Sequence, residues 1–270
     1  LVFISFFSVV IEESLKETLT FIRFILFSIA LLFFLKNIPD IITQTYKVLI
    51  CIVVLFFIDS LIQFYFGVNI IGIKKQNPFR VSSFFSDELI MGGFFYRLFP
   101  IFIAIHFFVK KKFDKFFFIY LFVFEVIIFL SGERTALILN NFYLFLMFII
   151  FVELRKKIIF TFIGLITFLA FFLLFNKNYQ QRYLIDTFQG LTHQQKEITL
   201  HKMHLFSNEH ESQYRTAINI FKKNIIVGTG PKSFRVECKK PEYRIDNVSC
   251  STHPHNFYIE LLTETGVMGF

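Results

Sequence analysis

The feature that most constrains this chain is a series of apolar blocks, each close to the roughly 20 residues that a helix needs to cross a lipid bilayer. The blocks are residues 21–35, 48–66, 89–109, 116–130, 136–152 and 158–175, and residues 1–11 resemble the remnant of another. Hydrophobic residues make up 55% of the 270 residues, above the ~45–50% of ordinary soluble proteins. This content disfavours the alternative, the buried helices of a large soluble domain. The sequence therefore predicts an all-α fold, a polytopic transmembrane helix bundle.

The same pattern predicts the domain organisation. Residues 1–175 would hold about seven spans, the first of them partial. Residues 176–256 form a large polar segment, and residues 257–270 begin to be apolar again, as the start of a further span. Since the chain starts at Leu1 rather than at Met and stops at Phe270 inside such a segment, we expect a fragment. Residues 1–11 lack the basic region of a cleaved signal peptide, which favours a partial span.

Two short basic loops, residues 110–115 and 153–157, predict the orientation in the membrane. Loops rich in Lys and Arg face the cytoplasm. The turn at residues 131–135 then lies on the opposite side, and so do residues 67–87 and the loop 176–256. Long loops are translocated largely regardless of their charge. The formal net charge of +8 is explained by membrane topology, so we expect no nucleic-acid partner.

The three cysteines divide between these regions. Cys51 lies within a span and is predicted to be a packing residue. Cys238 and Cys250 lie in the loop 176–256, which is oxidising if it faces a bacterial periplasm, so a disulfide is predicted between them. An alternative joins both cysteines with His253 and His255 in a zinc site, although the spacing lacks the short cysteine pair common in such sites.

The loop 176–256 is predicted to be folded and helical. Apolar residues between positions 214 and 225 recur at the i, i+3, i+4, i+7 spacing of one helix face. Arg215 and Lys222 lie on a neighbouring face, which is either solvated or functional. Gly228-Thr229-Gly230 then ends this helix. These residues resemble half of a phosphate-binding loop, but no strand precedes a full glycine-rich pattern, and the indication is weak.

Two charged residues stand at the predicted ends of spans. Arg134 follows Glu133 at the junction of two apolar blocks, where a charge is costly unless it is paired, hydrated or functional. Arg134 is either paired with Glu133 or placed to bind an anion, because the planar guanidinium suits phosphate. Glu88 opens another span as a counter-charge, a catalytic carboxylate or an acid favoured by the helix N-terminus.

The end of the chain carries a recognisable pattern. His255-Asn256, followed by Gly266 and Gly269, resembles the signature of the O-antigen ligase and O-antigen polymerase superfamily of bacterial membrane proteins. Three upstream blocks, residues 80–100, 131–139 and 214–235, are similar to that superfamily in order and spacing. Ser83 stands where many members have Gly, and Ile138 replaces a common Leu, departures that bear on the subfamily.

The resemblance implies a glycosyltransferase of the bacterial inner membrane, active at its periplasmic face without metal or other cofactor. The implied donor is an undecaprenyl-diphosphate-linked glycan, and the acceptor is lipid A-core or another glycan. By motif position, Arg134 and Arg215 would bind the diphosphate and His255 would be catalytic. The residues expected to support the site are Glu88, His253, Asn256 and Glu264.

Two alternatives remain open. A polymerase would join lipid-linked repeat units with the same motifs. A transporter of lipid-linked oligosaccharides would also be polytopic and basic, but transporters place charges near the bilayer midplane in repeated halves, and no such repeat is present in this sequence.

Overall fold

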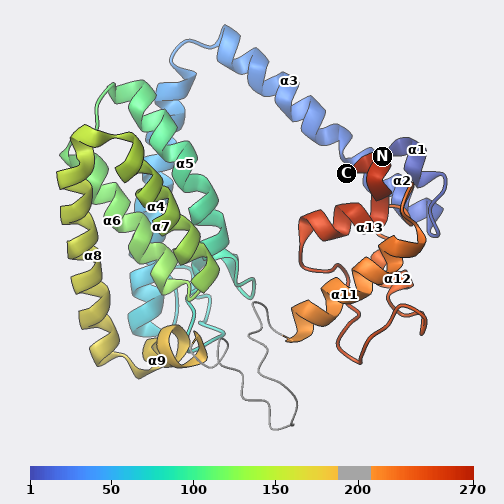
Figure 1. The fold of residues 1–270 in the computed structure, drawn as a ribbon. Helices are drawn as coiled ribbons and strands as arrows, with labels where there is room; N and C mark the ends of the chain where they lie inside the picture. Colours follow the sequence, from blue (N-terminus) through green and yellow to red (C-terminus); the bar gives the residue numbers. More distant parts are fainter. Residues whose placement is uncertain (188–207) are drawn as a thin grey trace. The chain divides into compact units, whose positions relative to one another are not determined.

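A computed structural model describes residues 1–187 and 208–270, and its elements are shown in Figure 1. The described residues form helices and loops, and their only β-structure consists of isolated bridges. The chain divides into two compact units: unit 1 is Leu1–Asn37 with Gln189–Phe270, and unit 2 is Ile38–Phe188. These limits differ from the predicted ones, since residues 1–37 group with the C-terminal region and residues 176–188 group with the helix bundle.

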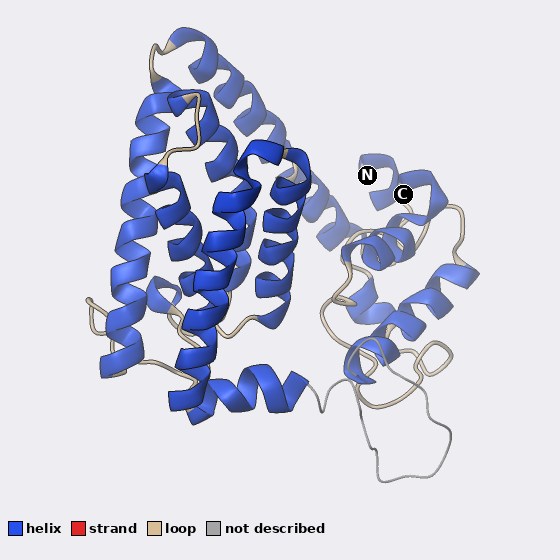
Figure 2. Ribbon diagram, turned by 60° about the vertical axis from the view of Figure 1, so that its left-hand side comes forward, coloured by secondary structure: helices blue, strands red, loops and turns tan. Residues whose placement is uncertain are grey.

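Unit 2 is a bundle of long helices (Figure 2). In chain order they are α4 (Ile41–Phe66), α5 (Met91–Lys110), α6 (Lys115–Leu130), α7 (Arg134–Ile150) and α8 (Arg155–Phe175). Helix α6 packs against all four of the others. Its apolar residues are therefore the most deeply buried, and every residue from Phe124 to Leu130 lies in the interior. Asp114 starts this helix by accepting a hydrogen bond from the backbone N–H of Phe117 at 3.0 Å.

Short helical turns complete unit 2. They are η1 (Ser83–Phe85), η2 (Val152–Leu154), α9 (Lys177–Gln180) and the π-helical turn η3 (Gln181–Ile185). Helix α9 and turn η3 directly follow α8. The hydroxyl of Tyr179 donates to the carbonyl of Leu130 at 2.8 Å, and that of Tyr183 donates to the carbonyl of Phe129 at 2.7 Å. These bonds hold the segment against the end of α6.

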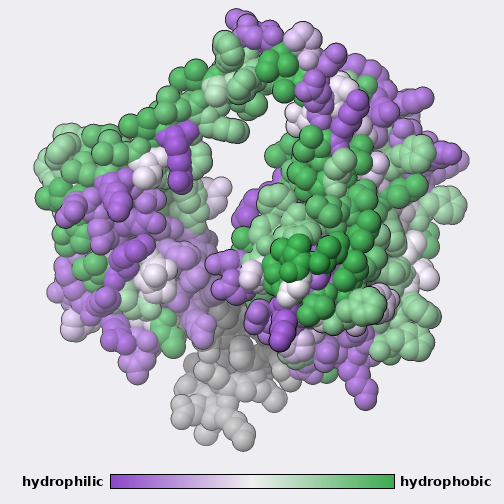
Figure 3. Space-filling view, turned by 180° about the vertical axis from the view of Figure 1, so that it is seen from behind, coloured by the Kyte–Doolittle hydropathy of each residue, from purple (hydrophilic) through white to green (hydrophobic). Residues whose placement is uncertain are grey.

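Four helical segments within the described residues are long and apolar enough to cross a membrane. They are Ile11–Asn37, Ile41–Phe66, Met91–Lys110 and Val152–Phe175, and the apolar helix Arg134–Ile150 is shorter. Many of their apolar side chains point outward: Phe160 is 76% exposed and Leu174 is 72% exposed. Figure 3 shows hydrophobic side chains along the sides of unit 2 and hydrophilic ones at its two ends. An exposed surface of this kind suits lipid rather than water, so the prediction of an all-α, polytopic membrane protein is confirmed.

The connecting loops of unit 2 gather at two ends. At one end the rings of Phe113 and Phe151 lie 5.2 Å apart, which brings the two basic loops together. At the other end the backbone N–H of Val81 donates to the carbonyl of Leu130 at 3.0 Å. The loop before α5 therefore meets the turn between α6 and α7, away from the basic loops.

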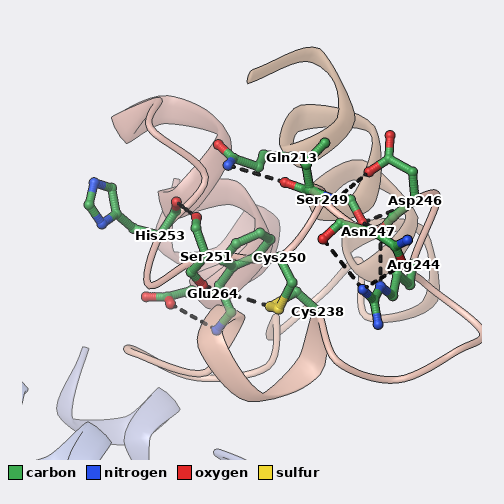
Figure 4. Close-up of a disulfide and its surroundings, with 12 residues drawn as sticks. Gln213, Cys238, Arg244, Asp246, Asn247, Ser249, Cys250, Ser251, His253 and Glu264 are labelled. Atoms are coloured by element: carbon green, nitrogen blue, oxygen red, sulfur yellow. Dashed lines mark hydrogen bonds between the residues drawn. A yellow bond between two sulfur atoms is a disulfide. The ribbon is translucent and has the colours of Figure 1, made fainter. Parts of the chain in front are cut away.

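Unit 1 is built around a smaller core. Its described helices are α1 (Val2–Ser5), α2 (Ile11–Thr20), α3 (Ile22–Asn37), α11 (Asn208–Lys223), α12 (Phe234–Glu237) and α13 (Phe257–Gly269). Helix α11 packs against α13, and the buried cluster consists of Ala217, Ile220, Phe234, Cys238 and Tyr243. A disulfide joins Cys238 to Cys250 beside this core (Figure 4).

The first residues differ from the expected partial span. Residues 1–11 do not form one helix, because α1 ends after Ser5 and the chain turns before α2 begins. Buried serines explain the turn: the hydroxyl of Ser5 lies 2.7 Å from that of Thr18, and Ser14 donates to the carbonyl of Pro231. Polar side chains satisfied in this way draw the segment into unit 1.

Candidate functional site

Arg134 is the first residue of α7, directly after the turn that ends α6. Its Nη1 atom donates to Oγ1 of Thr187 at 3.1 Å. The neighbouring Glu133 carboxylate accepts from the backbone N–H of Gly92 at 2.9 Å and of Gly93 at 3.0 Å, in the first turn of α5. Because Glu133 makes these bonds to α5, an ion pair with Glu133 does not account for the position of Arg134.

Two further arginines surround this turn. Arg80 lies 3.5 Å from the Glu133 carboxylate, and its Nε atom donates to the carbonyl of Ser131 at 3.1 Å. The Nε atom of Arg182 donates to the carbonyl of Gly132 at 3.0 Å. Burial raises the pKa of Glu133, and the positive charge of Arg80 opposes this rise. The turn between α6 and α7 therefore carries a surplus of positive charge.

Glu88 does not take the position expected for it. Its side chain is exposed, and it precedes the N-cap residue of α5, Ile90, by two positions. The acid at the N-terminus of α5 is instead Glu133, far along the sequence. The pair Gly92-Gly93 permits this approach, because a Cβ atom at Gly92 would lie 2.9 Å from the Cβ atom of Glu133. Among local sequence features, only this glycine pair hints at such a contact.

His255 lies on the surface of unit 1 with a positive φ of 56°. Its ring stacks on that of His210 of α11, with centroids 5.1 Å apart and planes at 16°, and lies 4.3 Å from the ring of His253. Burial lowers the pKa of His255, and the nearby His253 lowers it further. Near neutral pH the imidazole is therefore uncharged and able to accept a proton. No sequence pattern pointed to His210.

Arg215 is an exposed residue of α11 that pairs with Glu211 one helical turn earlier. It follows His210 by five residues, roughly 7.5 Å along a helix axis. The structure thus places Arg215 and the three histidines on unit 1, and it places Arg134, with Arg80 and Arg182, on unit 2.

The other residues of the predicted site organise the backbone of unit 1. Asn256 begins α13, because its side chain accepts hydrogen bonds from the N–H groups of Tyr258 and Ile259, both at 3.1 Å. The carboxylate of Glu264 accepts from the N–H groups of Lys232 at 2.8 Å and Phe234 at 3.2 Å. Asn256 therefore fixes the backbone next to His255, and Glu264 joins α13 to the loop before α12.

The weak indication of a phosphate-binding loop is wrong. The N–H of Gly228 donates to the carbonyl of Asn224, that of Thr229 to Thr263, and that of Gly230 to Glu264. All three donors are used within unit 1, so none is left for a phosphate. The tight turn instead lets this loop pack against α13.

The zinc alternative also fails on the chemistry of its donors. Zinc binds cysteine as a thiolate, and the sulfur atoms of Cys238 and Cys250 are joined in a disulfide. Figure 4 shows this bond, with Ser251 and His253 on the segment that follows it. The disulfide fixes the start of the segment that carries His253 and His255.

Comparison with protein families matches residues 116–270 to the family described as O-antigen ligase. The matched region runs from α6 to α13, covers more than half of the chain, and includes Arg134, Arg215 and His255. Comparisons with curated proteins and with solved structures found no match. The family implies glycosyl transfer at a membrane, in agreement with the spanning helices. The chain belongs to the O-antigen ligase family.

Proposed function

We propose that this protein transfers a glycan from an undecaprenyl-diphosphate carrier to lipid A-core or a similar acceptor, at the periplasmic face of the bacterial inner membrane. The observation that carries the proposal is the surplus of arginine at the turn between α6 and α7, within the region that matches the family. A cationic turn at the end of a membrane bundle suits a lipid whose head group is a diphosphate.

In the proposed reaction the acceptor hydroxyl attacks the anomeric carbon of the donor sugar. The bond between that carbon and the diphosphate oxygen breaks, and the leaving diphosphate gains negative charge. Arginine stabilises this charge electrostatically, an effect that is often the largest in catalysis, and motif position assigns this role to Arg134 and Arg215. His255 accepts the proton that the hydroxyl loses.

The proposal assigns charge neutralisation to arginine and not to a metal ion. Within residues 1–187 and 208–270, no three His, Cys, Asp or Glu side chains gather as metal ligands would. Asn256 positions the backbone next to His255, Glu264 joins α13 to the loop before α12, and His253 lowers the pKa of His255. Glu88 has no part in this scheme.

A polymerase would use the same donor and the same residues, and would differ only in its acceptor. The species that accumulates in a deletion strain separates the two functions. Unligated polymer on the lipid carrier supports the ligase, and single lipid-linked units indicate the polymerase. The lysine-rich loops and the arginine turn lie at the two ends of the bundle, which disfavours a transporter, because a transporter needs charges near the midplane.

The proposed function is tested by transfer assays on the full-length protein in membranes. We expect His255→Ala to reduce transfer by about 100-fold or more, as loss of a general base does. Arg134→Lys keeps the charge but removes the planar fork, and we expect a loss of about tenfold or more.

Arg244 provides a matched control. This exposed arginine donates to the carbonyls of Asp246 and Asn247, and Arg244→Lys is expected to leave transfer unchanged. Undiminished transfer by His255→Ala at normal expression would rule out its catalytic role. Wild-type activity of Arg134→Lys would argue against binding of the diphosphate by its fork.

A further inference from the structure

We propose that Arg182 is a second diphosphate-binding residue of unit 2, beside Arg134, and this inference rests on the function proposed above. Arg182 lies in the π-helical turn η3, after the last long helix of the bundle. It belongs to none of the sequence blocks that resemble the family. Its assignment depends on tertiary contacts alone.

Four contacts bring α9 and η3 to the turn between α6 and α7. The ring of Tyr183 stacks on that of Phe129, with centroids 4.7 Å apart and planes at 15°, and its hydroxyl donates to the carbonyl of the same residue. The hydroxyl of Tyr179 donates to the carbonyl of Leu130. Between these tyrosines, Nε of Arg182 donates to the carbonyl of Gly132 at 3.0 Å. The guanidinium of Arg182 is thus fixed at the turn that Arg134 follows.

Hydrogen bonding leaves donors of both arginines available. Among the described residues, Arg182 makes a hydrogen bond only through Nε, so both its terminal nitrogens remain for another acceptor. Within the same part of the chain, Arg134 makes one hydrogen bond, to the uncharged hydroxyl of Thr187, and Asp186 attracts it electrostatically without a hydrogen bond. Because Thr187 follows Arg182 by five residues, one segment supplies Arg182 and positions Arg134.

The charges near this turn are unequal. Arg80, Arg134 and Arg182 carry positive charge. Against these three charges stand two carboxylates. Glu133 is bound to two backbone N–H groups of α5 and to Arg80, and Asp186 attracts Arg134 and accepts a hydrogen bond from the side chain of Gln181 at 2.8 Å. The positive charges therefore outnumber the negative ones near this turn.

Like charges held close together repel, and an anion between them removes the cost. A diphosphate offers several negative charges and many acceptor oxygens, and guanidinium forks bind such groups in pairs. A single phosphate would need only one of the two forks. The inference therefore predicts a preference for diphosphate over monophosphate.

The test measures binding, which does not require transfer. Purified full-length protein in lipid nanodiscs is titrated with farnesyl diphosphate and, separately, with farnesyl monophosphate. We expect Arg182→Gln to weaken diphosphate binding by about tenfold or more, since a hydrogen bond to a charged group is lost, and to change monophosphate binding little. Arg182→Lys is expected to fall between Arg182→Gln and the wild type, because charge remains without the fork.

Tyr183→Phe is the matched control. It removes a tether of the same segment, the bond to the Phe129 carbonyl, without changing any charge. If Arg182 served only as an anchor through Gly132, Tyr183→Phe and Arg182→Gln would reduce binding of both probes alike. That result, or unchanged diphosphate binding by Arg182→Gln, would overturn the inference.

The outcome is separable from that of the proposed function. A selective loss of diphosphate binding in Arg182→Gln upholds the inference even if His255→Ala transfers normally. In that case the catalytic role of His255 fails and the diphosphate site stands.

Discussion

His255 combines an unusual backbone with a crowded electrostatic setting. Its φ of 56° is uncommon for a residue with a side chain, and this conformation follows the buried Pro254 and precedes the helix cap Asn256. The groups that influence it are the two neighbouring histidines and the carboxylates of Glu209 and Glu260. Burial and His253 together hold its pKa below the ordinary value.

We expect substitutions at His253 to shift the pH dependence of transfer in opposite directions. His253→Ala removes the neighbour that lowers the pKa of His255, so this pKa rises and the acid limb of the profile moves to higher pH. His253→Arg places a permanent positive charge beside His255, so the limb moves to lower pH. The measurement is transfer by full-length protein from about pH 5 to pH 8. If the acid limb stays at the same pH in both variants, the limb does not arise from the titration of His255.

At the scale of elements, α13 depends on a close contact between two backbones. Gly266 has a φ of 62°, and a Cβ atom there would lie 2.3 Å from the carbonyl oxygen of Ile226. The N–H groups of Val267 and Met268 donate to the carbonyls of Ile225 and Ile226 at 2.8 and 3.1 Å. A glycine is therefore required at this position of the motif, because both the conformation and the space exclude a side chain.

We predict that Gly266→Ala destabilises the fold by about 2 kcal/mol or more, from backbone strain and overlap. The thermal midpoint of purified protein should fall by at least a few degrees. Gly164→Ala in α8 is the matched control, since nothing lies within 4 Å of a Cβ atom there and alanine favours a helix. An equal thermal midpoint for both variants would contradict the conclusion that position 266 requires a glycine.

At the scale of the whole molecule, unit 2 has two chemically different ends. One gathers the lysine-rich loops near Phe113 and Phe151, and the other gathers Arg80, Arg134 and Arg182. From the rule that basic loops stay in the cytoplasm, we propose that the lysine-rich end faces the cytoplasm. The arginine turn would then be exposed to the opposite compartment.

Cysteine labelling tests this orientation. In a Cys51→Ser background, where the Cys238–Cys250 disulfide leaves no other thiol, Lys111→Cys and Lys177→Cys place single exposed thiols at the two ends. A maleimide that cannot cross the inner membrane should label Lys177→Cys directly. It should label Lys111→Cys only after that membrane is permeabilised. The reverse pattern would invert the proposed topology.

Block length alone predicted about seven spans, whereas four segments of the described residues are long and apolar enough to cross a membrane. The sequence alone did determine where the helices of the bundle lie, since polar residues separate its apolar blocks. The charged turn at Arg134 followed for the same reason, and the motif pointed to His255. Ser83 shows what the sequence alone does not predict. It has a φ of 53°, and its hydroxyl donates to the buried Asp59. The positive φ accounts for the glycine common at this position, and only the structure shows the aspartate that Ser83 contacts.

The tertiary structure alone decided which distant groups meet. Glu133 reached the N-terminus of α5 and Arg182 reached the turn before α7 through contacts that span about 40 and 50 positions. His210 came to stack on His255 in the same way. Local periodicity records which face of a helix is apolar, but it does not record which helix that face will meet. The packing of α4 to α8 decides which groups surround Arg134 and Arg182, and the packing of α11 against α13 decides which groups surround His255.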